Sequence, residues 1–315
     1  MKKSATPNLP WVPVEDYKYP TGWTASGQSD AHARAYCEML EHGQILFFRE
    51  PPFDFPVADQ KFLLEQEWSE LRMHKNVSYR PSEDSLRGVS GDRETISRLQ
   101  SIMRNYSAQV TQFLGKFLTP YAGKWNQDFA SFRPLEEEGR DLPLHKRNDL
   151  LHVDAFPSRP TRGARILRVF TNLNLKKPRV WRTTEGFEVL ARRYAGGAGL
   201  QDIAEDNSFL SRTVQDFGSK LGFGVLGRTP YDMFMLRFHD FLKENEEFQR
   251  DCPKTQLEFP PRATWLVFTD CVAHAVMSGQ YAIEQTFLIP PNALVALEAA
   301  PYRILGNIAG RALIS

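Results

Sequence analysis

The sequence has few cysteines and no long apolar run. Its three cysteines, Cys37, Cys252 and Cys271, are widely spaced, which fits neither a disulfide framework nor a cysteine-based metal site. No stretch approaches the roughly 18 uninterrupted apolar residues that a membrane-spanning helix needs, and the first ten residues lack the apolar run of a secretory signal. We therefore expect reduced thiols and a cytoplasmic location.

An excess of positive charge is also missing. The chain of 315 residues has 39 Lys and Arg against 38 Asp and Glu, a formal net charge of +1. Binding to phosphate backbones needs a concentrated basic excess, so we expect no nucleic-acid partner, and any basic patch must be local. A hydrophobic content of 42% with 24% charged residues is typical of a globular protein. Without repeats or linkers, the sequence predicts a single domain over residues 1–315.

Helical patterns dominate the N-terminal part of the chain. Residues 1–25 contain several prolines among aromatic residues and predict an extended arm. Apolar residues then recur at helical spacing, with one short apolar strand between them. The predicted helices cover about residues 30–41, 57–71 and 94–117, and the strand covers residues 43–48.

Short apolar runs dominate the rest of the chain and predict strands. They cover residues 129–133, 166–173, 264–268 and 281–289, and helical patterns interrupt them from about 184 to 251, including 231–250. The order is not βαβ, and no Gly-rich turn joins a strand to a helix, which disfavours a nucleotide-binding fold. The pattern favours an α+β protein with a double-stranded β-helix core (jelly-roll, cupin-like), buttressed by N-terminal and inserted helices.

A candidate metal site begins at His152 and Asp154. On a strand, side chains two residues apart leave the same face. A second imidazole would complete the two-histidine, one-carboxylate triad that binds Fe(II) and leaves three positions open for a 2-oxo acid and O2. His274 follows a predicted strand and is the expected third ligand, with His239 and His145 as alternatives for that position.

The cosubstrate 2-oxoglutarate requires a cation for its buried distal carboxylate, and arginine pairs with a carboxylate through two hydrogen bonds. In many enzymes with this iron-binding triad, the arginine follows the second histidine of the triad by about ten residues. Here residues 283–286 contain no cation. Arg168, enclosed by apolar neighbours, is therefore the predicted anchor, with Arg165 as the alternative. Asn172 and Gln285 are predicted to add hydrogen bonds to the cosubstrate.

Cations are dense around this site, and the pattern predicts a basic pocket mouth that binds an anionic substrate. The cations are Arg133, Arg140, Lys146, Arg147, Arg159, Arg162, Arg165, Arg168, Lys176, Lys177, Arg179 and Arg182.

The carboxylate of Asp154 also bears on the type of reaction. In such a site, Ala or Gly at this position can leave room for a halide ion, which leads to halogenation. The presence of Asp154 therefore favours hydroxylation.

Several segments together resemble the Kdo 3-hydroxylase family, and the likeness covers most of the chain. They are GQILFF at 43–48, SFRP at 131–134, LHVDAFPSRP at 151–160, RVFTNLN at 168–174 and DCVAH at 270–274. The resemblance implies an Fe(II)/2-oxoglutarate-dependent dioxygenase of lipopolysaccharide biosynthesis. Such an enzyme uses O2 to hydroxylate C3 of 3-deoxy-D-manno-oct-2-ulosonic acid (Kdo) on a Kdo-bearing lipid A precursor, giving Ko.

The family's pattern implies that His152, Asp154 and His274 bind the metal and that Arg168 anchors 2-oxoglutarate. Arg133 and Arg162 are predicted substrate contacts from their position and charge. The resemblance also implies peripheral contact with the cytoplasmic face of the inner membrane. The oligomeric state and the choice between two Kdo residues stay open.

Three other functions stay open at this point. One is an oxygenase of the same fold that hydroxylates another small anionic or lipid substrate. Another is an inactive jelly-roll protein that only binds sugar or lipid. The third is a cupin-type isomerase or hydrolase with a different metal, which would not consume 2-oxoglutarate.

Overall fold

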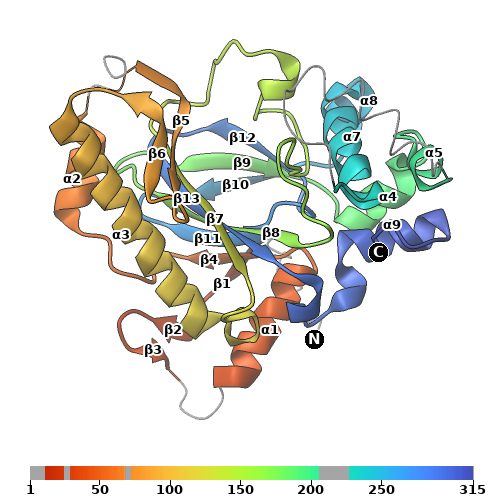
Figure 1. Cartoon of the computed structure of the whole chain (residues 1–315), viewed down its shortest axis with the longest axis horizontal. Helices are drawn as coiled ribbons and strands as arrows, with labels where there is room; N and C mark the ends of the chain where they lie inside the picture. Colours follow the sequence, from red (N-terminus) through yellow and green to blue (C-terminus); the bar gives the residue numbers. More distant parts are fainter. Residues whose placement is uncertain (1–10, 25–28, 67, 69–71, 206–226, 315) are drawn as a thin grey trace, which may run out of the picture.

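Two antiparallel β-sheets form the centre of the protein (Figure 1). The computed structural model describes residues 11–24, 29–66, 68, 72–205 and 227–314. In the larger sheet, all neighbouring strands pair antiparallel except β1 and β4, which are parallel. Its order is β1 (Trp11–Pro13), β4 (Ile45–Phe48), β11 (Thr264–Phe268), β8 (Arg165–Asn172), β13 (Ala282–Ile289), β7 (Asn126–Arg133), β5 (Arg72–Arg80) and β6 (Ser85–Ser90).

The smaller sheet has three strands, and a separate hairpin lies near the N-terminus. The three strands are β10 (Thr255–Phe259), β9 (Arg179–Thr183) and β12 (His274–Ser278), and the hairpin pairs β2 (Tyr17–Lys18) with β3 (Gly22–Trp23). Short 3-10 helices cover Thr119–Tyr121, Leu144–Lys146, Pro291–Ala293 and Leu297–Ala299.

The helices lie in two groups (Figure 1). The N-terminal group contains α1 (Ser29–Glu41), α2 (Val57–Glu65) and α3 (Arg93–Phe117), of which α3 crosses the larger sheet. The other group gathers at the opposite side of the molecule and contains α4 (Phe187–Tyr194), α5 (Leu200–Glu205), α7 (Pro230–Glu244), α8 (Glu246–Asp251) and α9 (Pro301–Ala309). No helix of the described ranges is long and apolar enough to cross a bilayer.

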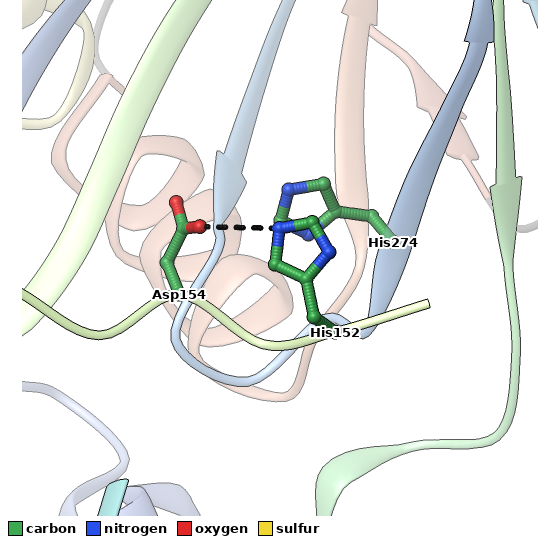
Figure 2. A group of neighbouring side chains, drawn as sticks. All are labelled: His152, Asp154 and His274. Atoms are coloured by element: carbon green, nitrogen blue, oxygen red, sulfur yellow. Dashed lines mark ion pairs between the residues drawn. The ribbon is translucent and has the colours of Figure 1, made fainter. Parts of the chain in front are cut away.

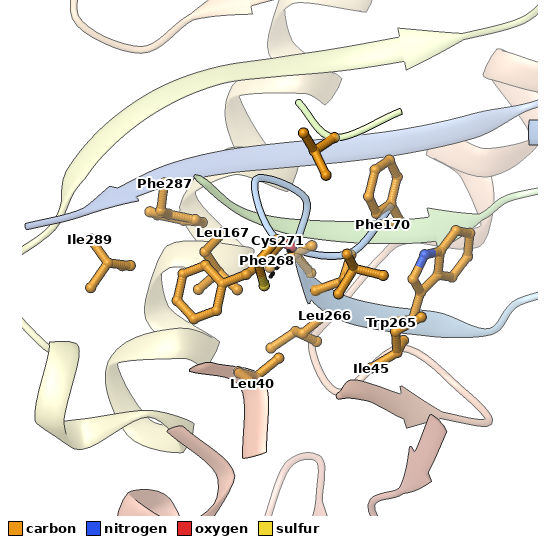
Figure 3. Close-up of a cluster of buried hydrophobic side chains, with 14 of the residues drawn as sticks. Leu40, Ile45, Leu167, Phe170, Trp265, Leu266, Phe268, Cys271, Phe287 and Ile289 are labelled. Atoms are coloured by element: carbon orange, nitrogen blue, oxygen red, sulfur yellow. Dashed lines mark hydrogen bonds between the residues drawn. The ribbon is translucent and has the colours of Figure 1, made fainter. Parts of the chain in front are cut away.

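Aromatic side chains fill the space between the two sheets. Trp265 stacks on Phe259 with ring centroids 3.9 Å apart and lies edge-on to Trp181 at 5.5 Å. Phe170 contacts both tryptophans. On the other face of the larger sheet, Leu167 and its neighbours pack with residues of α1 (Figure 3). Because burial of one such side chain stabilises a fold by about 1.5–3 kcal/mol, these two clusters hold the sheets in place.

Most of the predicted elements are confirmed, with shifted ends. The helices at 30–41 and 94–117 are α1 and α3, and the five predicted strands are β4, β7, β8, β11 and β13. Helix α3 begins where periodicity predicts because Asp92 caps it, accepting a hydrogen bond from the Thr95 N–H at 2.8 Å. The sequence did not predict β5, β6, β9 and β10, whose short apolar runs are interrupted by charged residues, or the five-residue strand β12.

The structure corrects one local prediction and adds detail to two others. In the segment predicted as an extended arm, Trp11–Pro13 pairs with β4 as an edge strand; residues 1–10 lie outside the described part. The helix predicted over 57–71 ends at Glu65, and the chain is already in β5 at Arg72. The helical pattern predicted over 231–250 is confirmed and forms two helices, because the Asn245 side chain accepts from the Phe248 N–H and starts α8. Of the predicted insertion, residues 206–226 also lie outside the described ranges.

Candidate metal centre

Two backbone pairings bring the predicted metal ligands together. His152 forms an isolated antiparallel bridge with His274, the first residue of β12, through N···O distances of 3.1 and 2.9 Å. The Asp154 N–H donates to the carbonyl of Thr269 at 2.7 Å. Asp154 therefore lies just beyond the bridge rather than on a regular strand. Ligand atoms of the three side chains all lie within 4.8 Å of one another (Figure 2).

Both imidazoles are oriented by a backbone carbonyl. His152 Nδ1 lies 2.7 Å from the Leu150 oxygen, and His274 Nδ1 lies 2.9 Å from the Val272 oxygen. Since a carbonyl can only accept, Nδ1 carries the proton and Nε2 keeps its lone pair. His152 Nε2 lies 3.7 Å from Asp154 Oδ1, a separation that one ion between them can bridge. The hydrogen bond from Nδ1 to a backbone carbonyl is typical of histidines that bind a metal through the other ring nitrogen.

The electrostatics favour the protonation states that a metal requires. Burial lowers the pKa of His152 well below its usual value, and the positive charge that His274 could carry lowers it further. Burial also lowers the pKa of His274. For Asp154, burial would raise the pKa, but Arg168 and the two imidazoles lower it overall. Two neutral imidazoles and one carboxylate are the donor set that Fe(II) takes in the facial triad, so these residues fit that ion.

The alternatives for the third ligand lie elsewhere. The ring of His239, on α7, contacts the His152 ring at 4.9 Å between centroids, and its Nδ1 lies 2.7 Å from the Val153 oxygen. His239 is nevertheless not part of the three-residue ligand cluster. His145 is exposed and pairs with two carboxylates of α7. The structure therefore places His239 next to the centre and His145 on the surface.

The face of β8 distinguishes Arg168 from Arg165. Arg168 Nη2 lies 2.9 Å from Asp154 Oδ2, and Nη1 lies 2.7 Å from Glu284 Oε1. Arg165 is fully buried and pairs with Asp270 at 2.7 Å. Arg168 is thus the one of the two that contacts the triad.

The two predicted helpers of cosubstrate binding, Asn172 and Gln285, already hydrogen-bond to other parts of the protein. The Asn172 amide donates to the carbonyls of Lys177, Phe259 and Pro260 and accepts from the Asn174 N–H, so its polar atoms hold a turn. Gln285 accepts from Ser107 of α3 and donates to the Asp128 carbonyl. It therefore lies on the helix-covered face of β13, away from the triad, because adjacent strand residues point to opposite faces.

The predicted substrate contacts occupy different environments. Arg133, on β7, donates to Glu284 at 2.8 Å and is largely buried. Arg162 lies on the loop before β8, is exposed and donates to the Gly227 carbonyl at 3.2 Å. Most of the predicted cations already form ion pairs inside the protein, which leaves less free positive charge than the sequence predicts. These are Arg133, Arg140, Arg147, Arg159, Arg165, Arg168 and Arg179.

Sequence reasoning missed Glu284. This carboxylate is 2% exposed and lies between the guanidinium groups of Arg168 and Arg133. Burial would raise its pKa, but the two arginines lower it overall. A usable signal was present, since a charged residue inside the apolar run of residues 282–289 needs a buried partner.

The antiparallel sheet, the triad and the adjacent arginine define the class of iron(II)- and 2-oxoglutarate-dependent dioxygenases. A family model described as 3-deoxy-D-manno-oct-2-ulosonic acid (Kdo) hydroxylase matches residues 23–312. The chain therefore belongs to the Kdo hydroxylase family.

Solved structures of the Kdo hydroxylase KdoO, a non-heme Fe(II) α-ketoglutarate-dependent dioxygenase, are similar over nearly the whole chain. The complex with succinate and Fe(III) has 32% identity and a TM-score of 0.81, covering 97% of this chain and 98% of that one. The apo structure has 33% identity and a TM-score of 0.81, covering 97% of each chain. The complex with α-ketoglutarate and Fe(III) has 32% identity and a TM-score of 0.79, again covering 97% of each. None of the curated protein sequences compared with this chain matches it.

Proposed function

We propose that this dioxygenase hydroxylates C3 of Kdo on a Kdo-bearing lipid A precursor of lipopolysaccharide, giving Ko. The observation that carries the proposal is the cluster of His152, Asp154 and His274 beside Arg168, in a chain that resembles KdoO along 97% of its length.

Each residue of the centre has a defined task in this proposal. His152 and His274 would bind Fe(II) through Nε2, and Asp154 would bind it through a carboxylate oxygen. When bound, Fe(II) with 2-oxoglutarate and O2 supplies the oxidising power to insert one oxygen atom into a C–H bond, while 2-oxoglutarate is converted to succinate and CO2. The burial of both histidines keeps bulk water from these atoms.

Arg168 would bind the distal carboxylate of 2-oxoglutarate. Its Nε is buried without a hydrogen-bond partner, whereas its two Nη atoms contact Asp154 and Glu284. Cosubstrate binding would exchange the Asp154 contact for a contact with the incoming carboxylate. Arg133 and Arg162 stay proposed contacts for the anionic substrate.

We further propose that the two sheets form the double-stranded β-helix of a single dioxygenase domain over residues 1–315. The aromatic cluster of Phe170, Trp181, Phe259 and Trp265 supports this, since it packs the sheets face to face. We also propose that the enzyme contacts the cytoplasmic face of the inner membrane peripherally, because its proposed substrate is anchored there by lipid A.

The test is turnover by the purified protein with Fe(II), ascorbate, 2-oxoglutarate and Kdo-lipid A. We expect succinate in equal amount to a lipid product that has gained one oxygen atom on Kdo, seen by mass spectrometry. Asp154→Ala should abolish both products, and Asp149→Ala, at a partly exposed aspartate of the same segment that pairs with Arg147, should retain them. Succinate without lipid oxidation would reject the substrate, and the absence of both products would reject the hydroxylase function.

A further inference from the structure

The loop that follows Asp154 is held at two places, by Arg228 and by Asp232 in the first turn of α7. Arg228 donates to the carbonyls of Phe156, at 3.4 Å, and Pro157. Asp232 accepts from the backbone N–H groups of Thr161 and Arg162, at 2.7 and 2.9 Å. The side chain of Arg159, between these anchors, therefore starts from a defined backbone.

Arg159 lies against two aromatic rings. Its guanidinium carbon is 4.0 Å from the ring centroid of Phe129, on β7, and 4.6 Å from that of Phe156. It pairs with Asp128, whose Oδ2 is buried without a partner, and Arg159 Nε is also buried without one. Aromatic faces hold a guanidinium plane in one orientation and leave its edges for hydrogen bonding.

A second guanidinium lies on the same phenylalanine. Arg80, at the end of β5, is 4.7 Å from the Phe129 centroid. Its carboxylate partner is Glu83, an exposed residue of the β5–β6 turn. Two guanidinium groups that share one ring repel each other, and an anion between them would offset that repulsion.

Arg159 lies beside the metal centre, and Arg80 joins it through the Phe129 ring. Arg159 lines one pocket with Asp154 and Phe156, and the guanidinium carbon of Arg168 is 5.9 Å from the Phe156 ring centroid. Burial lowers the pKa of Arg159 and the carboxylate of Asp128 raises it, while the positive charges of Arg168 and Arg80 lower it again, as expected for guanidinium groups in close range. Arg133, in contrast, is already paired with the buried carboxylate of Glu284.

We propose that Arg159 and Arg80 form a subsite that binds the carboxylate of an acidic sugar and thereby places that sugar next to the metal. The proposal rests on the proposed function for the identity of the sugar. The subsite joins a loop that follows the His-x-Asp segment to a hairpin strand far from it in sequence. Arg159 would supply the rigid contact and Arg80 the second charge.

The test measures the binding of free Kdo by calorimetry to the protein loaded with Co(II) and 2-oxoglutarate, alongside hydroxylation of Kdo-lipid A. We expect Arg159→Gln and Arg80→Gln each to weaken Kdo binding roughly tenfold, because each removes one charge partner of the carboxylate, with 2-oxoglutarate binding unchanged. Arg159→Lys should recover part of the affinity.

Arg87→Gln is the matched control, because Arg87 also pairs with Glu83, at 3.2 Å, but is not among the groups that lie on Phe129. Its Kdo affinity should equal that of the wild type. Equal affinity in all variants would overturn the subsite and leave the hydroxylase function standing. Loss of Kdo binding in the two variants without any wild-type hydroxylation would support the subsite and reject the proposed reaction. A wild-type protein that binds inorganic phosphate but not Kdo would overturn the assignment to a carboxylate.

Discussion

Arg168 has two carboxylate partners before any cosubstrate binds. Its side chain is 13% exposed and contacts both Asp154 and Glu284. Removing a guanidinium group from water is costly unless charges and hydrogen bonds compensate, and Glu284 provides that compensation from the neighbouring strand β13. The protein thus places the Arg168 guanidinium next to Asp154 before any cosubstrate binds.

Replacing Arg168 tests its role as the anchor. We expect Arg168→Gln to raise the KM for 2-oxoglutarate at least tenfold, because the neutral amide loses the charge-assisted bidentate contact. Metal binding should persist, since the triad is retained. Steady-state succinate formation and titration with Co(II) measure the two quantities, and Arg147→Gln, at an exposed arginine, is the control. An unchanged KM would assign the cosubstrate to another cation.

At the scale of elements, helix α7 contacts the ligand-bearing segment at several points. Its first turn holds the loop through Asp232, its middle places His239 on the ring of His152, and its last turn donates from Lys243 to the His145 carbonyl at 3.1 Å. A capping box formed by Thr229 and Asp232 fixes where the helix begins. One helix therefore positions the residues on both sides of the first two metal ligands.

His239 should influence metal affinity without being a ligand. We expect His239→Ala to weaken Co(II) binding about tenfold, in the range found for residues that orient metal ligands, because the His152 ring loses its neighbour and the Val153 carbonyl its donor. Asp240→Ala, on the same helix but facing exposed His145, should bind Co(II) as the wild type does. A complete loss of binding would instead indicate direct ligation.

Strand β13 separates two tasks on its two faces. Glu284 faces the site, whereas Gln285 joins the strand to Ser107 of α3 and to the Asp128 carbonyl, both at 2.6 Å. Gln285 is fully buried. This alternation directs the Gln285 side chain away from the triad.

Gln285→Leu should therefore cost stability rather than cosubstrate affinity. We expect the free energy of unfolding to fall by about 1–3 kcal/mol, because buried hydrogen-bonding groups lose their partner, with the KM for 2-oxoglutarate within a factor of two of wild type. Urea denaturation and succinate kinetics measure these. A selective rise in KM at unchanged stability would restore the cosubstrate role that the sequence predicted.

At the scale of the molecule, the two sheets bury His152 and His274 together. Burial lowers the pKa of both imidazoles, whereas in the unfolded chain they titrate near 6.5. Below that pH the unfolded chain binds more protons than the folded metal-free protein, so the free energy of unfolding decreases as the pH falls.

The melting temperature of the metal-free protein should consequently drop between about pH 7.5 and pH 5.5. The metal-loaded protein should melt at a higher temperature throughout, since a ligand that binds only the folded state stabilises it. Differential scanning calorimetry of both forms across this range tests the prediction. A His152→Gln, His274→Gln double variant should show a smaller drop, and an equal drop would assign the acid sensitivity to other groups.

Features that depend on residues close together in the sequence could be predicted, whereas features that depend on distant residues could not. His-x-Asp is a local spacing, and strands β8, β11 and β13 are dense apolar runs, so both could be predicted. The hydrogen-bond partners of Asn172 and Gln285 could not be predicted, because neither the turn that Asn172 holds nor the face on which Gln285 lies is evident from its neighbours in sequence.

The sequence by itself determined the chemistry: two histidines, an aspartate and a nearby arginine, in an order and spacing that only need short segments of strand and turn. The tertiary structure decided which side chains serve that chemistry from a distance. It placed Arg168 rather than Arg165 at the triad, His239 on His152, and Arg80 on Phe129. These contacts depend on the register of paired strands and on helix packing, which arise from the summed burial of many residues and not from any local pattern.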